Sequence, residues 1–275
     1  MGVAVALDDY TPLQIATIRI AGAAAILTIF AWLTGREMPG RTGSKRIWLH
    51  ILGFALFSNV IPFSLLGWGM THVASGFAGV TMAVVPLLVL PLAHFLVPGE
   101  RLTPTKTVGF LTGFVGTLVL IGPAAFLSAG SDLEGLARLA CVAASASYAF
   151  GAINTRLAPP TGMISYSAAT LVLASLIIFP VMVWTDGLPT FGADQSTLAV
   201  ILLALFPTAI ATLMMVTIIR GPGPSFLSLV NYQVPIWSVV FGTVLLGEVL
   251  PPSLFAALLL ILGGLAISQF AARRG

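Results

Sequence analysis

Nine apolar segments follow one another along this chain, each about as long as a membrane-spanning helix, with short polar connections between them. A helix needs about 20 mainly apolar residues to cross the ~30 Å hydrocarbon core of a bilayer, because each residue adds ~1.5 Å. The segments are residues 12–34, 47–71, 74–97, 105–127, 136–155, 163–185, 196–219, 224–246 and 252–271. The ten-residue alternation typical of barrel strands is absent. We therefore predict an all-α polytopic membrane protein with a helical bundle.

The composition excludes a water-soluble fold. Of 275 residues, 58% are hydrophobic and only 8% are charged, whereas soluble domains carry roughly 25% charged residues. The basic residues form no aromatic-interleaved stripe, so we expect no nucleic acid partner. The single cysteine, Cys141, lies in an apolar run and offers neither a disulfide framework nor a thiolate cluster. We expect the lipid bilayer as the main partner, and no metal or cofactor.

The segment from Met1 to Leu7 is apolar but too short to cross a bilayer. It also lacks the charged start and full apolar length of a signal peptide. We interpret it as the end of a first span that is largely missing from this chain. A protein with nine spans is the alternative.

The basic residues gather on one side of the predicted membrane topology. Ten lie there: Arg36, Arg41, Lys45, Arg46, Arg101, Lys106, Arg156, Arg220, Arg273 and Arg274. The other side has Arg138 as its one basic residue, together with most of the acidic ones. Because short cytoplasmic loops are enriched in Lys and Arg, we predict a multi-pass inner-membrane protein with a cytoplasmic C-terminus.

Two stretches of the chain share the order of a proline, a Gly-Glu pair and a second proline. They are Pro86, Gly99-Glu100 and Pro104 in the first, and Pro235, Gly247-Glu248 and Pro252 in the second. The charge pattern places the two Gly-Glu pairs on opposite sides of the membrane, which is typical of transporters with inverted repeats. We predict two membrane halves, residues 1–127 with the stub and four spans, and residues 128–275 with five. Five plus five spans would complete the symmetry.

These residues resemble a known family. Thr17-Ile18-Arg19-Ile20, the run from Ser75 to Gly99-Glu100-Arg101, and its counterpart from Pro224 to Gly247-Glu248 are similar to the EamA family of the drug/metabolite transporter superfamily. Within the family the chain most resembles exporters of aromatic amino acids of the YddG type. The resemblance implies ten helices around a central cavity between the halves. It also implies a small-molecule substrate.

Polar and aromatic residues at helical spacing are the candidates for substrate binding, because in lipid such a face must point inward. The candidates are Asn59, Trp68, Tyr148, Ser228, Asn231, Tyr232 and Trp237. Their alternative role is hydrogen bonding and packing between helices. A pocket of this kind suits neutral amino acids with an apolar body.

Several residues are predicted to shape the bundle. Prolines inside spans remove a backbone hydrogen bond and permit a kink; the candidates for hinges are Pro62, Pro86, Pro207 and Pro235. The stripe of Gly109, Gly113 and Gly116 is expected to pack closely against Gly263-Gly264. A monomer is expected, and a dimer through this stripe is the alternative.

The charged residues set limits on the mechanism. All nine carboxylates fall in loops or at span ends, so no acidic group is available in mid-membrane as a proton carrier. This favours facilitated diffusion or exchange over proton antiport. Arg19 lies inside a span and either attracts a substrate carboxylate or has a structural role, in which it snorkels outward or caps backbone carbonyls of a neighbouring helix. Glu100 and Glu248 are expected to cap the helices that follow them.

The sequence therefore predicts an alternating-access exporter of aromatic or other neutral amino acids and related small metabolites. A nucleotide-sugar or sugar-phosphate antiporter is one alternative, although it would need several buried cations for phosphate. A membrane-embedded enzyme is another. The chain has no HExxH or GxSxG motif, and we assign no catalytic residues.

Overall fold

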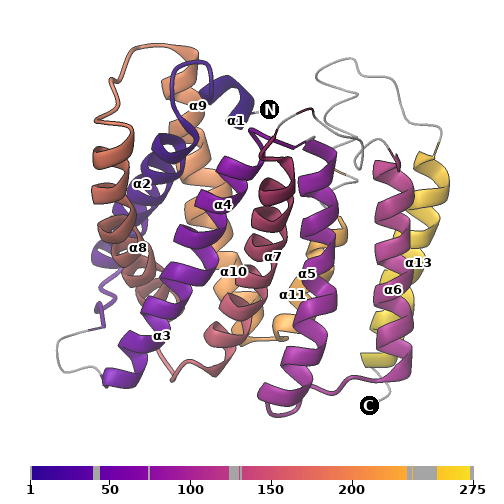
Figure 1. Ribbon diagram of the computed structural model, residues 1–275. Helices are drawn as coiled ribbons and strands as arrows, with labels where there is room; N and C mark the ends of the chain where they lie inside the picture. The colour runs from indigo at the N-terminus through magenta and orange to yellow at the C-terminus, as the bar shows by residue number, and fades with distance from the viewer. Residues whose placement is uncertain are drawn as a thin grey trace. The chain divides into compact units, whose positions relative to one another are not determined.

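The computed structural model describes residues 2–39, 44–73, 75–123, 130, 132–233, 237 and 253–272, and the regular elements in this part of the chain are helices (Figure 1). The first half contains α1 (Gly2–Ala6), α2 (Pro12–Leu33), α3 (Lys45–Ala55), η1 (Leu56–Val60), α4 (Ile61–Gly69), α5 (Ser75–Leu96) and α6 (Pro104–Ile121). The second contains α7 (Glu134–Leu157), α8 (Met163–Thr185), α9 (Gln195–Ala204), η3 (Leu205–Ile210), α10 (Ala211–Arg220), α11 (Pro224–Ser228), η4 (Leu229–Tyr232) and α13 (Leu254–Ala272).

The predicted helical membrane fold is confirmed. Five helices among the described residues are long and apolar enough to cross a bilayer: Pro12–Leu33, Lys45–Gly69, Glu134–Leu157, Met163–Thr185 and Gln195–Arg220. Helices α5, α6 and α13 coincide with three further predicted spans. The predicted span 224–246 begins as α11 and η4, and most of it lies outside the described residues.

Local sequence signals explain where the helices begin. Thr11 caps α2 through a capping box with Gln14, and Pro12 occupies the first helical position, where its missing N–H costs nothing. At α6, Pro104 again occupies the first helical position, and the side chain of Thr103 accepts a hydrogen bond from the backbone amide of Lys106. Polar caps therefore stand where apolar runs start.

The short apolar segment at the start of the chain forms α1 and packs against α9. Ala6 is fully buried in a cluster with Tyr10, Ile15 and Val200. The hydroxyl of Ser196 donates to the carbonyl of Val5 at 2.9 Å. This segment therefore forms part of the folded bundle.

The chain forms two compact units, and each draws on both ends of the sequence. Unit 1 comprises Met1–Trp68 and Asn154–Gly221, and unit 2 comprises Gly69–Ile153 and Pro222–Gly275. These units group the helices differently from the halves 1–127 and 128–275, which describe a repeat in sequence. The repeat itself stays a prediction.

In unit 1, α2 and α8 pack against each other in opposite directions. The amide side chain of Gln14, at the start of α2, donates to the carbonyls of Asp186 and Gly187, just past the end of α8, at 3.4 and 3.5 Å. Between them lies an apolar core that includes Ile20 and Leu171. The longer helices α3–α4 and α9–α10 also run in opposite directions in Figure 1.

Charged residues separate between the two ends of unit 1. At one end, the guanidinium of Arg156 donates to the carbonyls of Ile219 and Arg220, where α10 ends. At the other end, Asp186 accepts from the hydroxyl of Thr11, and Asp194 caps α9. The structure thus groups basic and acidic residues as the topology requires, and which end faces the cytoplasm stays a prediction.

In unit 2, α6 and α13 make the closest contact through glycine. A Cβ on Gly264 would come within 2.5 Å of the carbonyl oxygen of Gly109 and 2.6 Å of the amide nitrogen of Gly113. The expected contact of the glycine stripe is therefore confirmed for Gly264. Gly263 has no atom within 4 Å of such a Cβ and takes no part in it.

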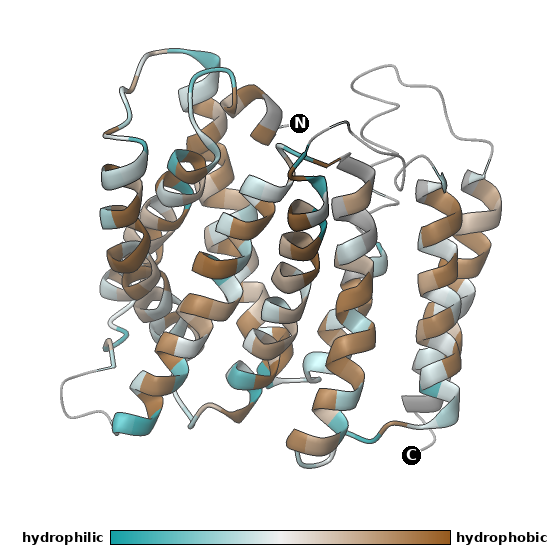
Figure 2. Cartoon of the chain, viewed as in Figure 1, coloured by the Kyte–Doolittle hydropathy of each residue, from teal (hydrophilic) through white to brown (hydrophobic). Residues whose placement is uncertain are grey.

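Hydrophobic residues predominate along the helices (Figure 2), and many of their large side chains are exposed. Large side chains such as Trp184, Phe95 and Leu259 are 92%, 80% and 77% exposed. Exposure of such residues in water would favour aggregation, and in a bilayer it costs nothing. The surface therefore agrees with a lipid environment.

Candidate transport site

Two membrane-length helices of unit 1 are interrupted by π-helical turns. The turn η1 joins α3 to α4, and η3 joins α9 to α10. Each begins at the leucine of the same three residues, Ala-Leu-Phe, at 55–57 and at 204–206. Turns of this type occur often at functional sites and bend the helix that contains them.

A polar side chain closes each π-helical turn in the same way. The amide of Asn59 donates to the carbonyl of Phe54 at 3.3 Å, and the hydroxyl of Thr208 donates to the carbonyl of Leu203 at 2.8 Å. In both cases the acceptor lies five residues before the donor. The widened turn leaves a carbonyl that lipid cannot satisfy, so a side chain supplies the hydrogen bond.

The two turns stand in register with the predicted repeat. Asn59 and Thr208 are 149 positions apart, as are Pro86 and Pro235. Pro207 lies within η3 and Pro62 lies just after η1. Pro86 lies inside α5, which continues through it, and Pro235 is outside the described residues. Two of the four predicted hinge prolines therefore lie in or next to a π-helical turn, and a hinge role for all four stays a prediction.

Arg19 projects from α2 towards these turns. Its Nε donates to the hydroxyl of Thr208 at 3.2 Å, and its guanidinium carbon lies 4.9 Å from the centroid of the Phe63 ring. A cation over an aromatic face is stabilised by the ring quadrupole. Arg19 therefore joins α2, α4 and η3 within unit 1 through a hydroxyl and an aromatic ring. Its predicted roles, attraction of a substrate carboxylate or capping of backbone carbonyls, stay predictions.

A polar network at the basic end of unit 1 escaped sequence reasoning. Nδ1 of His50 lies 2.9 Å from the carbonyl oxygen of Asn154 and 3.0 Å from its Oδ1. The backbone carbonyl of His50 accepts hydrogen bonds from the side-chain amide of Asn154 at 2.7 Å and from the hydroxyl of Tyr166 at 3.1 Å. Arg220 lies over the Tyr166 ring at 4.3 Å. The network holds α3, α7, α8 and α10 together.

Among the predicted substrate residues, Tyr232 and Ser228 are engaged with the backbone of unit 2. Tyr232 is 1% exposed, and its hydroxyl donates to the carbonyl of Phe110 at 2.8 Å. Its ring packs against Gly113, where a Cβ would meet it at 3.0 Å. Ser228 is buried and donates to the carbonyl of Ser225 at 2.8 Å. These contacts give both side chains a packing role, and substrate binding by them stays a prediction.

The remaining predicted residues are divided between the units. Asn59 and Trp68 belong to unit 1, whereas Tyr148 belongs to unit 2. Trp68 and Tyr148 are partly buried, and Trp237 is 54% exposed. The side chain of Asn231 is outside the described residues. Substrate binding by Asn59, Trp68, Tyr148, Asn231 and Trp237 stays a prediction.

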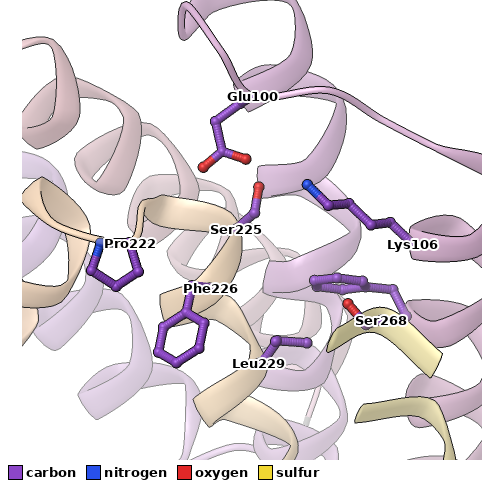
Figure 3. A pocket seen from close by; sticks show the side chains of 8 residues that line it. Glu100, Lys106, Pro222, Ser225, Phe226, Leu229 and Ser268 are labelled. Atoms are coloured by element: carbon purple, nitrogen blue, oxygen red, sulfur yellow. The ribbon is translucent and has the colours of Figure 1, made fainter. Parts of the chain in front are cut away.

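Unit 2 contains a cavity of about 310 Å³ that the sequence did not reveal (Figure 3). It lies where the connection between α5 and α6 meets α11 and α13. Its lining consists of Glu100, Lys106, Phe110, Pro222, Ser225, Phe226, Leu229 and Ser268. The cavity thus combines one acidic group, one basic group, two hydroxyls and an apolar wall.

The two charged groups converge on this cavity from neighbouring positions in the chain. The carboxylate of Glu100 and the ammonium of Lys106 both point towards Ser225 in Figure 3. The ammonium donates to the carbonyl of Arg101 at 3.3 Å. Lys106 and Glu100 do not form an ion pair with each other. The ion pair within the described part of the chain joins Arg138 to Glu134 at 2.6 Å.

The other described carboxylates lie outside the interiors of the helices. No described carboxylate lies in the middle of a helix; each is in a connection, at a cap or, like Glu134, at the first helical residue. Within the described residues, no three His, Cys, Asp or Glu side chains come together as metal ligands. Glu248 is outside this part of the chain.

Comparison with known proteins identifies the family. The EamA-like transporter family matches residues 2–122 and 135–269. The uncharacterized inner membrane transporter YedA of Escherichia coli K12 is 27% identical over 90% of this chain and 78% of its own length. The aromatic amino acid exporter YddG of Ancylobacter novellus is 30% identical over 83% of this chain and 77% of its own.

A more distant relative and a solved structure agree with this. An uncharacterized transporter of Archaeoglobus fulgidus is 25% identical over 94% of this chain and 88% of its own. A crystal structure with 21% sequence identity superposes with a TM-score of 0.83 and covers 99% of this chain and 92% of that chain, which shows the same fold. The chain is a multi-pass membrane transporter, and it belongs to the EamA-like transporter family.

Proposed function

We propose that this protein is an inner-membrane exporter of aromatic or other neutral amino acids and related small metabolites. It works by alternating access, with two inverted halves that exchange conformations around a largely uncharged substrate path. Transport is facilitated diffusion or exchange. The substrate leaves chemically unchanged.

The observation that carries this proposal is the matched pair of π-helical turns at Asn59 and Thr208. Two copies of one bend, in helices that run in opposite directions, suit a protein whose halves must adopt each other's conformation. Each turn is a local hinge, because the widened turn has fewer regular helix bonds to break. A fixed pore would need no such pair.

The substrate class is supported by one relative and by the charge distribution. The YddG relative is named an aromatic amino acid exporter and covers most of this chain. A chain with 8% charged residues has few groups to bind a multiply charged solute. Arg19, which lies within a span, already contacts Thr208 and Phe63. A sugar phosphate would need a cluster of cations.

The position of the carboxylates supports uncoupled transport. Proton-driven carriers commonly place an acidic group at mid-membrane, where protonation removes a costly charge. The described carboxylates lie at helix ends and in connections. We therefore expect the substrate gradient to drive transport.

Uptake into proteoliposomes tests this function. Purified full-length protein should take up labelled L-tryptophan or L-leucine down its gradient, with or without a pH difference across the membrane. Glucose 6-phosphate serves as the competing substrate class. Uptake of the phosphate alone would favour the antiporter alternative, and uptake that requires an imposed pH difference would contradict the uncoupled mechanism.

A further inference from the structure

The cavity between the α5–α6 connection, α11 and α13 has the composition of a binding site for a small zwitterion. Its volume of about 310 Å³ lies at the lower end of the ~300–1,000 Å³ range of ligand sites, which is room for one small molecule. Its lining carries one carboxylate and one ammonium, and the two do not pair with each other among the described residues.

We propose that this cavity is a subsite for the head group of a zwitterionic α-amino acid, with the substrate ammonium at Glu100 and the substrate carboxylate at Lys106. The inference rests on the proposed function, because it takes that substrate class and adds a binding site for it within unit 2. The carboxylate of Glu100 and the ammonium of Lys106 point into the same space from two sides (Figure 3).

Lys106 has hydrogen-bonding capacity to spare for a substrate carboxylate. Its ammonium has three N–H donors, and the structure records one hydrogen bond, to the carbonyl of Arg101 at 3.3 Å. Lys106 is half-buried, so water screens its charge less than that of an exposed lysine. A carboxylate placed here would gain a charge-assisted hydrogen bond.

The rest of the lining suits an amino acid with an apolar side chain. Phe110 and Leu229 are buried and form an apolar floor, while Phe226 is 41% exposed and flanks it. The hydroxyls of Ser225 and Ser268 come from buried residues and add neutral hydrogen-bonding groups. The balance of one acid and one base disfavours a phosphate, which Glu100 would repel.

Gly223 leaves the space that the carboxylate of Glu100 occupies. It adopts a φ of +114°, which L side chains rarely adopt, and a Cβ there would collide with Oε1 of Glu100. A side chain at this position would therefore displace the carboxylate. The backbone next to α11 is thus shaped around the acidic group of the subsite.

Equilibrium binding to the full chain in nanodiscs tests the proposal, with labelled L-tryptophan and two competitors that each lack one charge. L-Tryptophan methyl ester lacks the carboxylate, and indole-3-propionate lacks the ammonium. We expect each competitor to bind the unmodified protein about tenfold more weakly than L-tryptophan, because a hydrogen bond between charged groups is lost.

The variants should remove these preferences one at a time. Lys106→Gln should lower the affinity for L-tryptophan to that for the methyl ester and leave the affinity for the ester unchanged. Lys106→Arg should retain the preference for L-tryptophan over the ester. Glu100→Gln should lower the affinity for L-tryptophan to that for indole-3-propionate and leave the affinity for indole-3-propionate unchanged. Arg101→Gln is the matched control, because Arg101 is an exposed charge of the same connection outside the cavity lining.

The outcomes separate this proposal from the function on which it rests. If both variants bind L-tryptophan saturably and still prefer it over the methyl ester and over indole-3-propionate, the subsite alone is overturned. No saturable binding of any of the three probes would overturn the proposed function together with it. If Glu100→Gln or Lys106→Gln does not fold, Gly223→Ala decides: the proposal requires weaker L-tryptophan binding and unchanged indole-3-propionate binding.

Discussion

Asn59 and Thr208 occupy equivalent places in two oppositely directed helices, and the side chain of each donates a hydrogen bond to the carbonyl five residues earlier. The two residues differ in chemistry, amide against hydroxyl, but they satisfy the same backbone group. Because an unsatisfied carbonyl in hydrocarbon is costly, these side chains make the two bends possible. The pairing of the bends is the structural basis of the transport mechanism that we propose.

Replacement of Thr208 by valine should slow transport. Valine removes the hydrogen bond to Leu203 and the contact with Arg19 while it keeps the shape of the side chain. We expect a loss of about 1–2 kcal/mol in stability and a transport rate reduced several-fold, measured by thermal unfolding and proteoliposome uptake. Thr217→Val is the matched control, because Thr217 makes an ordinary bond to Leu213 on the exposed face of α10. Equal effects of both variants would contradict a special role for η3.

Replacement of Asn59 by leucine should produce the same phenotype in the other bend. Leucine is similar in size but leaves the carbonyl of Phe54 without its donor. We expect a comparable loss of rate, and a Thr208→Val, Asn59→Leu double variant with less than the sum of the two losses if both bends serve one conformational step. Fully additive losses would mean that the bends act separately.

Gly264→Ala should destabilise unit 2, whereas Gly263→Ala should not. The added methyl at Gly264 would meet backbone atoms of Gly109 and Gly113 that cannot move aside. Overpacking of this kind costs about 1–3 kcal/mol. Gly263 has free space around it and serves as the matched control. Thermal unfolding in detergent measures both, and equal melting temperatures would contradict the close contact of α6 and α13.

Tyr232→Phe distinguishes the packing role of this tyrosine from the predicted substrate role. Loss of the bond to Phe110 should cost about 1 kcal/mol of stability, with the affinity for substrate unchanged. If Tyr232 also binds substrate, the KM for L-tryptophan should rise in addition to this loss of stability. Measurement of the melting temperature and KM on one preparation decides between the two roles.

Asp194 should make the start of α9 sensitive to acid. The hydrogen bonds from Thr197 lower the pKa of Asp194 below its ordinary value of 3.8. A lowered native pKa adds stability above the unfolded value, and this contribution is lost as the pH falls through the native pKa. The melting temperature should therefore fall more between pH 6 and pH 3 for the unmodified protein than for Asp194→Asn. An equal fall in both would show that this cap does not titrate.

The membrane fold and part of its packing could be predicted from the sequence. The spans are set by apolar length, which the bilayer dictates, and the bounds of α2 and α8 closely match the prediction. The contact of Gly264 with Gly109 was also predictable, because small residues in lipid mark close helix approach. These features depend on local composition.

The π-helical turns and the cavity depend on which atoms meet in space. A π-helical turn changes hydrogen-bond register without a distinct composition, so Asn59 was predicted as a pocket residue and its backbone bond was missed. Glu100 was interpreted as a helix cap, because the sequence does not show that α11 and α13 bring Ser225 and Ser268 beside it. The repeated Ala-Leu-Phe at 55–57 and 204–206 was the one signal that could have revealed the bends.

Counterflow in proteoliposomes tests the central claim, alternating access in a carrier, most directly. Vesicles loaded with unlabelled L-tryptophan are diluted into a trace of labelled L-tryptophan. The account predicts that labelled L-tryptophan accumulates inside the vesicles transiently above its equilibrium level, because each outward transport of unlabelled substrate leaves the binding site open to labelled substrate outside. Thr208→Val should lower this peak. Simple equilibration of the label, at a rate independent of the internal load, would contradict the account.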